Sequence, residues 1–221
     1  MSLLRRLAGE TAIYGFSYIL SRVLHYVLLT WYLTHVLVPS QYGIYRDLYF
    51  YVAVLVVILT FRMETTYFRY ARENKAAVTT MSMSFLLTFA SVFLILLWIF
   101  RFDIASLIQY PDMTKHIMLL GMVLFFDVLS SVPFASLRQQ NRPFRFLFLK
   151  LGSILLNIGC VLFFIELAPR LASTGAFWQK IYTGDKIFYV ILANLLASAL
   201  TFLLLLPMLS KQALQWDFSF L

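Results

Sequence analysis

Polar and charged side chains interrupt several long apolar stretches of this chain, and these are the side chains that can do chemistry. Arg22 and His25 lie three residues apart in the apolar stretch 11–38, on one face of a helix. At about 1.5 Å per residue, Arg22 lies roughly 15 Å into that stretch, half the thickness of a bilayer's hydrocarbon core. A charge there costs at least ~2.5–3.5 kcal/mol on insertion scales, so it belongs in a bundle interior or a wet cavity. The pattern predicts a polar, cationic site inside a membrane protein, although His25 can equally form a hydrogen bond between helices.

Four more residues extend this predicted site. Lys150 and Asn157 are seven residues apart, roughly on one helical face, and Arg46 lies about one turn into another apolar stretch. Each also has a structural interpretation: Lys150 and Arg46 can reach the membrane surface, and Asn157 can join two helices by a hydrogen bond. Asp127 fits two roles, as an ion-pair partner for Arg22 or as a carboxylate that couples transport to protons or sodium.

Two other groups have commoner structural explanations. Glu64 lies between two arginines near the end of an apolar stretch, which favours a surface charge network. Tyr42, Tyr45 and Tyr49 recur at helical spacing and can stack on sugars, but such tyrosines more often form the aromatic belt at a membrane surface.

The sequence lacks the motifs of common enzyme sites. It contains no Gly-rich phosphate loop, no His-Glu-x-x-His, no Gly-x-Ser-x-Gly and no acidic cluster suited to magnesium on a diphosphate. Cys160 is the single cysteine, which excludes an internal disulfide and a cysteine-based metal site. We therefore expect no enzyme activity, no cofactor and no metal.

The composition indicates what positions these polar groups. Of 221 residues, 62% are hydrophobic and 13% charged, and the mean hydropathy is +0.83, which is typical of an all-α integral membrane protein. We predict a bundle of about six transmembrane helices, at 12–37, 43–62, 77–100, 116–137, 144–166 and 187–209. The net charge of +8 would suggest nucleic acid in a soluble protein, but the basic residues here mostly lie in the links between spans.

The basic residues also predict the orientation. With a cytoplasmic N-terminus, the inner segments carry ten of them: Arg5, Arg6, Arg62, Arg69, Arg72, Lys75, Arg138, Arg142, Arg145 and Lys211. The outer segments carry five: Arg101, Lys115, Arg170, Lys180 and Lys186. This excess predicts that both termini are cytoplasmic.

Short motifs follow one another in a fixed order along nearly the whole chain. They are Gly9-Glu10-Thr11-Ala12-Ile13-Tyr14-Gly15 with Ser21-Arg22-Val23-Leu24, then Pro39-Ser40-Gln41-Tyr42-Gly43-Ile44-Tyr45, Met63-Glu64-Thr65 with Phe68-Arg69, Tyr110-Pro111, and Leu137-Arg138-Gln139-Gln140-Asn141-Arg142-Pro143. In this order they resemble bacterial polysaccharide exporters of the O-antigen flippase type. The segment 21–24 also resembles the first helix of the lipid II flippases of the same superfamily.

The resemblance implies the fold of the multidrug/oligosaccharidyl-lipid/polysaccharide flippase superfamily, in which two helical lobes surround a central cavity. Residues 1–210 would form one six-helix transmembrane lobe. The cytoplasmic tail 211–221 resembles the link to a second lobe, which a longer product or a second copy of the chain would supply.

The resemblance also implies a function. It is a polysaccharide transporter that flips an undecaprenyl-diphosphate-linked oligosaccharide across the bacterial cytoplasmic (inner) membrane for lipopolysaccharide or capsule biosynthesis. The expected partners are this lipid-linked substrate and membrane lipids, and no nucleic acid. Arg22 carries over best as a diphosphate-binding residue, because an arginine fork suits phosphate oxygens, while Arg46 and Lys150 carry over less directly.

Three alternatives stay open. A multidrug or cation extrusion lobe would favour acidic over basic cavity residues. A membrane-embedded glycosyltransferase or polymerase would need a catalytic carboxylate or histidine and large loops, and the predicted loops are short. A non-transporting assembly protein is the third.

Overall fold

The structure of the protein is a computed structural model, which describes residues 15–16, 19–20, 23–24, 30–174, 182 and 184–213. Over these residues the chain is helical and has no strand, which confirms the predicted all-α class. Five helical segments are long and apolar enough to cross a membrane: Pro39–Tyr70, Lys75–Ile99, Pro111–Gln139, Pro143–Ala172 and Lys186–Pro207. They match the second to sixth predicted spans. Of the 26 residues of the first predicted span, 12 lie outside the described residues, Arg22 and His25 among them.

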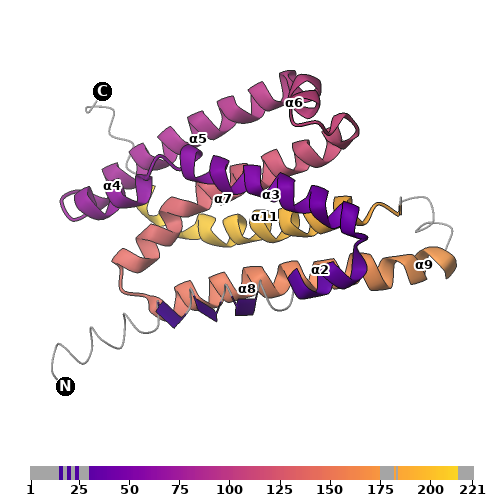
Figure 1. The fold of residues 1–221 in the computed structure, drawn as a ribbon. Helices are drawn as coiled ribbons and strands as arrows, with labels where there is room; N and C mark the ends of the chain where they lie inside the picture. The colour runs from indigo at the N-terminus through magenta and orange to yellow at the C-terminus, as the bar shows by residue number, and fades with distance from the viewer. Residues whose placement is uncertain are drawn as a thin grey trace.

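The helices run back and forth along one axis (Figure 1). In chain order they are α2 (Trp31–Val36), α3 (Pro39–Leu59), α4 (Met63–Tyr70), α5 (Lys75–Ile99), α6 (Arg101–Leu107), α7 (Thr114–Gln139), α8 (Pro143–Leu162), α9 (Ala168–Thr174) and α11 (Lys186–Ala213), with a 3₁₀ turn at Pro111–Met113 and a π-helical turn at Phe163–Leu167. One end of the bundle carries α4 and the link from α7 to α8, and we call it the α4 end. The opposite end carries α6 and α9, and we call it the α6 end.

Local sequence signals explain where several helices begin and end. Proline is the first residue of α3 and of α8, a position where its missing N–H has no helical acceptor to lose. Asn74 caps α5, because its side chain accepts a hydrogen bond of 3.1 Å from the Ala77 N–H. Between α3 and α4, Phe61 and Arg62 adopt left-handed conformations with φ of 46° and 52°, which ends α3 and redirects the chain.

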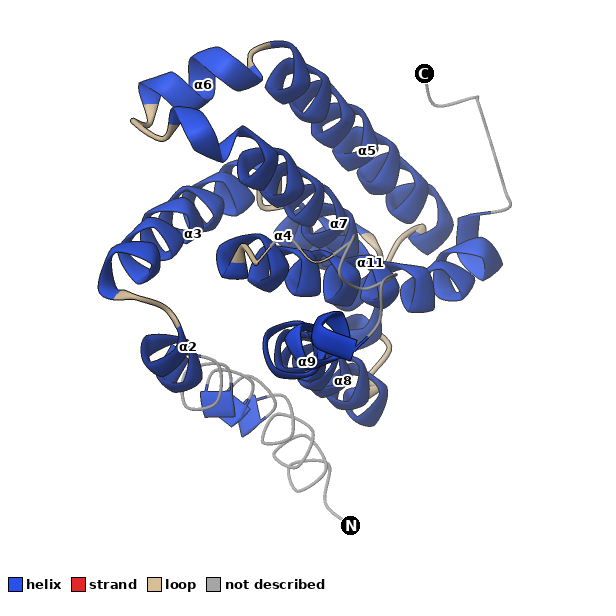
Figure 2. Ribbon diagram, turned by 90° about the vertical axis from the view of Figure 1, so that its right-hand side faces the viewer, coloured by secondary structure: helices blue, strands red, loops and turns tan. Residues whose placement is uncertain are grey.

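Helix α7 lies at the centre of the bundle, where it contacts α3, α4, α5, α6, α8 and α11 (Figure 2). Gly121 marks its close crossing with α5, since a Cβ there would lie 2.2 Å from Cδ2 of Leu97. Apolar clusters pack on α7 toward both ends: Ile117 and Leu120 belong to one, and Val128 and Val132 to the other. The polar residues of the candidate site lie on a different face of the same helix.

Candidate functional site

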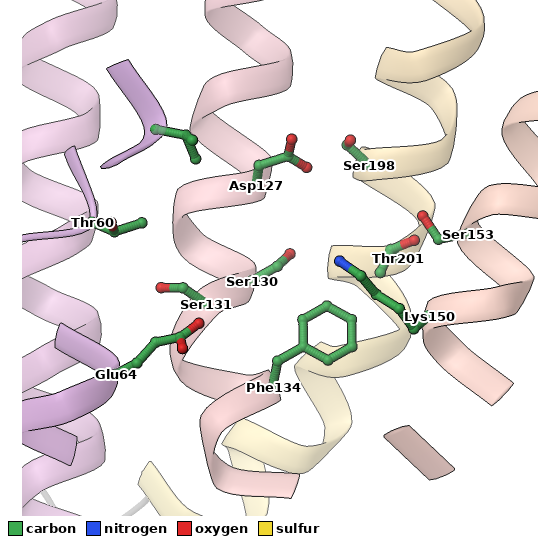
Figure 3. A pocket seen from close by; sticks show the side chains of 11 residues that line it. Thr60, Glu64, Asp127, Ser130, Ser131, Phe134, Lys150, Ser153, Ser198 and Thr201 are labelled. Carbon is green, nitrogen blue, oxygen red and sulfur yellow. The ribbon is translucent and has the colours of Figure 1, made fainter. Parts of the chain in front are cut away.

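A polar cavity of about 270 Å³ lies among α3, α4, α7, α8 and α11 (Figure 3). Hydroxyl groups, two carboxylates and an ammonium group make up most of its described wall. The lining residues are Val56, Thr60, Glu64, Asp127, Ser130, Ser131, Phe134, Lys150, Ser153, Ser198 and Thr201. A cavity with such a wall can hold a charged or hydrogen-bonding ligand in the interior of an apolar bundle.

Asp127 lies near the middle of α7 and faces this cavity. At about 1.5 Å per residue, it is roughly 20 Å from the beginning of the helix at the α6 end. The four α7 residues of the wall follow i, i+3, i+4, i+7 spacing, so one face of one helix supplies them all. From α11, the Ser198 hydroxyl is placed to donate a hydrogen bond to the Asp127 carboxylate (Figure 3). The carboxylate is thus presented to the cavity by α7 and held from α11.

Lys150 brings a positive charge into the same cavity, two turns into α8. Its Nζ lies 5.4 Å from the centroid of the Phe134 ring, an arrangement in which a cation is attracted to the ring face. The ammonium group also attracts the Asp127 carboxylate electrostatically. Because an isolated charge among apolar helices is costly, each of the two charges stabilises the other. The structure therefore brings together two of the residues that the sequence singled out.

The hydroxyl groups of the wall escaped the sequence analysis, which concentrated on charged residues. Ser130, Ser131 and Thr201 each donate to a backbone carbonyl three or four residues earlier, at 2.7–2.8 Å. Each hydroxyl proton is therefore satisfied within its own helix, while the oxygen lone pairs can accept hydrogen bonds from a ligand. The signal that points to them is the pairing of small polar residues on one face of an apolar helix, as for Ser198 and Thr201.

An ion pair lies beside the cavity at the α4 end. Glu64 of α4 accepts a hydrogen bond of 2.6 Å from Nη2 of Arg138 on α7. The Arg138 guanidinium also lies 5.2 Å from the ring centroid of Phe68 and 5.9 Å from that of Phe146. From its sequence neighbours, Glu64 was predicted to belong to a surface charge network. Instead its partner comes from the central helix, and its carboxylate lines the cavity.

The tyrosines of α3 form a ladder that packs into the bundle. Ring centroids are 6.2 Å apart for Tyr42 and Tyr45, and 4.5 Å apart for Tyr45 and Tyr49. Tyr45 is 8% exposed, and the Tyr49 hydroxyl accepts a hydrogen bond of 2.9 Å from the Asn194 side chain of α11. An aromatic belt that faces lipid was the commoner explanation of this spacing. Tyr45 is instead buried in the bundle, and Tyr49 joins α3 to α11.

The other predicted site residues do not line this cavity. Arg46 is exposed on α3, outside the lining set. Asn157 is buried on α8, and its Oδ1 has no hydrogen-bond partner. Arg22 and His25 lie outside the described residues, and with them the predicted pairing of Arg22 with Asp127. Among the described residues, no group of three or more histidine, cysteine, aspartate or glutamate side chains is placed to hold a metal ion.

Comparison with known proteins identifies no relative of this chain. Neither the protein-family models, nor the curated proteins, nor the solved structures contain a match to the chain.

Proposed function

We propose that this chain is one lobe of a multi-pass membrane transporter that flips a lipid-linked oligosaccharide across the bacterial cytoplasmic membrane. The observation that carries the proposal is the polar cavity, in which Lys150 and Asp127 lie among four of the five helical segments of membrane-spanning length. Charged residues are rare inside membrane-spanning bundles and usually mark the path of a substrate or an ion. The order of the sequence motifs supports the same class of substrate, an oligosaccharide linked to an undecaprenyl diphosphate.

In this proposal Lys150 binds the diphosphate. Its ammonium group supplies three donors, and the hydroxyls around it can bind the first sugar or a bridging water. Asp127 is the counter-charge of Lys150 while the cavity holds no substrate. A diphosphate that approaches Lys150 is repelled by Asp127 unless a proton or a cation neutralises that carboxylate. Asp127 is therefore the proposed coupling residue.

The distribution of basic residues supports cytoplasmic termini. Within the described residues, the α4 end carries Arg62, Arg69, Arg72, Lys75, Arg138, Arg142 and Arg145, and the α6 end carries Arg101, Lys115, Arg170 and Lys186. The more basic end of a membrane protein usually faces the cytoplasm, so we assign the α4 end to that side. A second lobe, or a second copy of this chain, is the proposed partner that completes the cavity.

One observation favours a second candidate function, the extrusion of organic cations. Two carboxylates, Asp127 and Glu64, line the cavity beside the single lysine of its described wall. A cationic drug would be attracted by Asp127 and repelled by Lys150. The two candidates therefore predict opposite effects of removing the lysine.

The test replaces Lys150 with glutamine in a strain that lacks the chromosomal copy. If the lysine binds the diphosphate, surface polysaccharide should fall at least about tenfold, because losing one charge-assisted contact costs ~1.4 kcal/mol or more. Arg145→Gln, an exposed charge on the same helix, is the matched control and should leave export unchanged. Membrane immunoblots check that both variants insert equally. Normal export by Lys150→Gln, together with faster ethidium efflux, would replace the flippase by the cation extruder.

A further inference from the structure

A second hollow lies at the α6 end, on the outside of the bundle. It has a volume of about 480 Å³ and lies among α5, α6, α7 and the beginning of α11. Arg101 and Lys115 contribute positive charges to its wall. Trp98, Phe102, Met118 and Met122 contribute much of its apolar surface. The wall combines two cations with an extended apolar face, and it includes no carboxylate.

Arg101 is held in place at this hollow. Its Nη1 donates a hydrogen bond of 3.0 Å to the Trp98 carbonyl, and its guanidinium lies 4.6 Å from the centroid of the Phe102 ring. That hydrogen bond uses one of the five N–H donors of the guanidinium, so the group can still bind an anion. An arginine fixed by stacking loses little side-chain freedom when it binds phosphate oxygens.

The titratable groups next to Lys115 on α7 and before α11, His116 and Asp185, interact with each other, so Lys115 can bind an anion. Next to it, His116 lies with Nε2 2.9 Å from Oδ2 of Asp185, the residue before α11. The Asp185 carboxylate is therefore engaged by a histidine. Lys115 is exposed, one residue into α7. Asp103 of α6 and Asp112, before α7, do not line the hollow, so the charge of the wall itself is positive and favours an anion.

The apolar part of the hollow extends along α7. From Lys115 to Met122 the helix rises roughly 10 Å, and Met118 lies on the same face between them. A charged rim with a continuous apolar wall beneath it matches a phosphate headgroup at the membrane surface and a hydrocarbon chain inside the membrane. A free phosphate would leave the apolar wall uncovered.

We propose that this hollow binds an anionic phospholipid, with its phosphate between Arg101 and Lys115 and an acyl chain along α7. The transported substrate is a different occupant, because the hollow and the polar cavity lie on faces of α7 roughly a third of a turn apart and in opposite halves of the helix. The lipid site therefore does not depend on the proposed function of the cavity.

The test measures lipid retention by the purified full-length chain with native mass spectrometry, after equilibration with equal amounts of phosphatidylglycerol and phosphatidylcholine in detergent. Each basic residue near an anionic lipid contributes about 1 kcal/mol, so two of them should favour phosphatidylglycerol at least about tenfold. R101Q/K115Q should lose this preference. R69Q/R72Q removes two exposed charges from the α4 end and should keep it.

Two further arms separate the headgroup from the chain and the resident lipid from the substrate. Met118→Trp keeps both cations but fills the apolar wall, so it should retain less of both lipids. Undecaprenyl diphosphate at an equal concentration should not displace phosphatidylglycerol. Equal retention of the two lipids by the unmodified chain, an unchanged preference in R101Q/K115Q, or displacement by undecaprenyl diphosphate would each overturn the proposal. Unchanged melting temperatures show that the variants are folded.

Discussion

The ion pair between Glu64 and Arg138 should join α4 to the central helix, and this can be measured as a free energy. We expect Arg138→Gln to lower the free energy of unfolding by about 2 kcal/mol. A charge-assisted hydrogen bond contributes ~1.5–3 kcal/mol when it is shielded, and the 42% exposure of the Glu64 side chain reduces this to about 1 kcal/mol. The contacts with Phe68 and Phe146 add about 0.5 kcal/mol each.

A double-mutant cycle isolates the ion pair from the aromatic contacts. Glu64→Gln, Arg138→Gln and the double variant are unfolded in mixed detergent, and circular dichroism at the helix bands gives the free energy of each. We expect a coupling energy of about 1 kcal/mol between the two side chains. Arg138→Lys should recover the pair but little of the stacking, because only the planar guanidinium stacks well on rings.

The control for this cycle is Arg142→Gln, which removes an exposed charge from the link between α7 and α8. It should change stability by less than about 0.5 kcal/mol. If Arg142→Gln costs as much as Arg138→Gln, or if the coupling energy is below about 0.3 kcal/mol, the assignment of Arg138 as the link between α4 and α7 is refuted.

Two further substitutions test the packing of α7 on α5 and of α3 on α11. Gly121→Ala should lower the free energy of unfolding by about 1–3 kcal/mol in the same assay, because its Cβ would collide with Leu97. Adding Leu97→Ala to that variant should recover part of the loss. The control is Gly159→Ala, whose Cβ would meet no atom within 4 Å, and it should be neutral or slightly stabilising. Tyr49→Phe should lower the free energy of unfolding by about 0.5–1.5 kcal/mol, since it removes the acceptor of the Asn194 hydrogen bond. Tyr51→Phe, on the exposed side of α3, should lower it by less than about 0.5 kcal/mol. Equal losses for the two tyrosines would contradict the inward packing of the ladder.

The long apolar helices could be predicted from the sequence, but the short helices that follow them could not. Apolar runs of sufficient length mark the five described spans, and a proline begins three of them, because both signals act locally. The second predicted span ends at residue 62, where α3 gives way to α4, so hydropathy marks this break, but it does not predict α4 itself. Phe61 and Arg62 adopt left-handed conformations that these residue types rarely adopt, and α4 beyond them packs on α5 and α7.

The sequence points to some of the charged residues that line the cavity, but it does not predict which partners they contact. A charge in an apolar run makes Asp127 and Lys150 candidates for the bundle interior, because burial is costly wherever the neighbouring helices lie. The same reasoning selected Arg46, which is exposed on α3. Which groups meet depends on how each helix is rotated about its axis, and the sequence of one helix does not fix that rotation. The same ambiguity affects Tyr45, whose spacing suits a belt that faces lipid as well as a ladder that faces α11.

The charges of the cavity suggest why these particular partners matter for the proposed transport. Glu64 is neutralised by Arg138, so an entering phosphate does not have to overcome its charge. Asp127 and Lys150 attract each other across the cavity, and this attraction changes when an anion binds to the lysine. Suppose that substrate bound at Lys150 raises the affinity of Asp127 for a neutralising ion by some factor. By linkage, neutralisation of Asp127 then raises the affinity for the substrate by the same factor. Under the proposed function, this reciprocity makes the substrate and a neutralising proton or cation bind together.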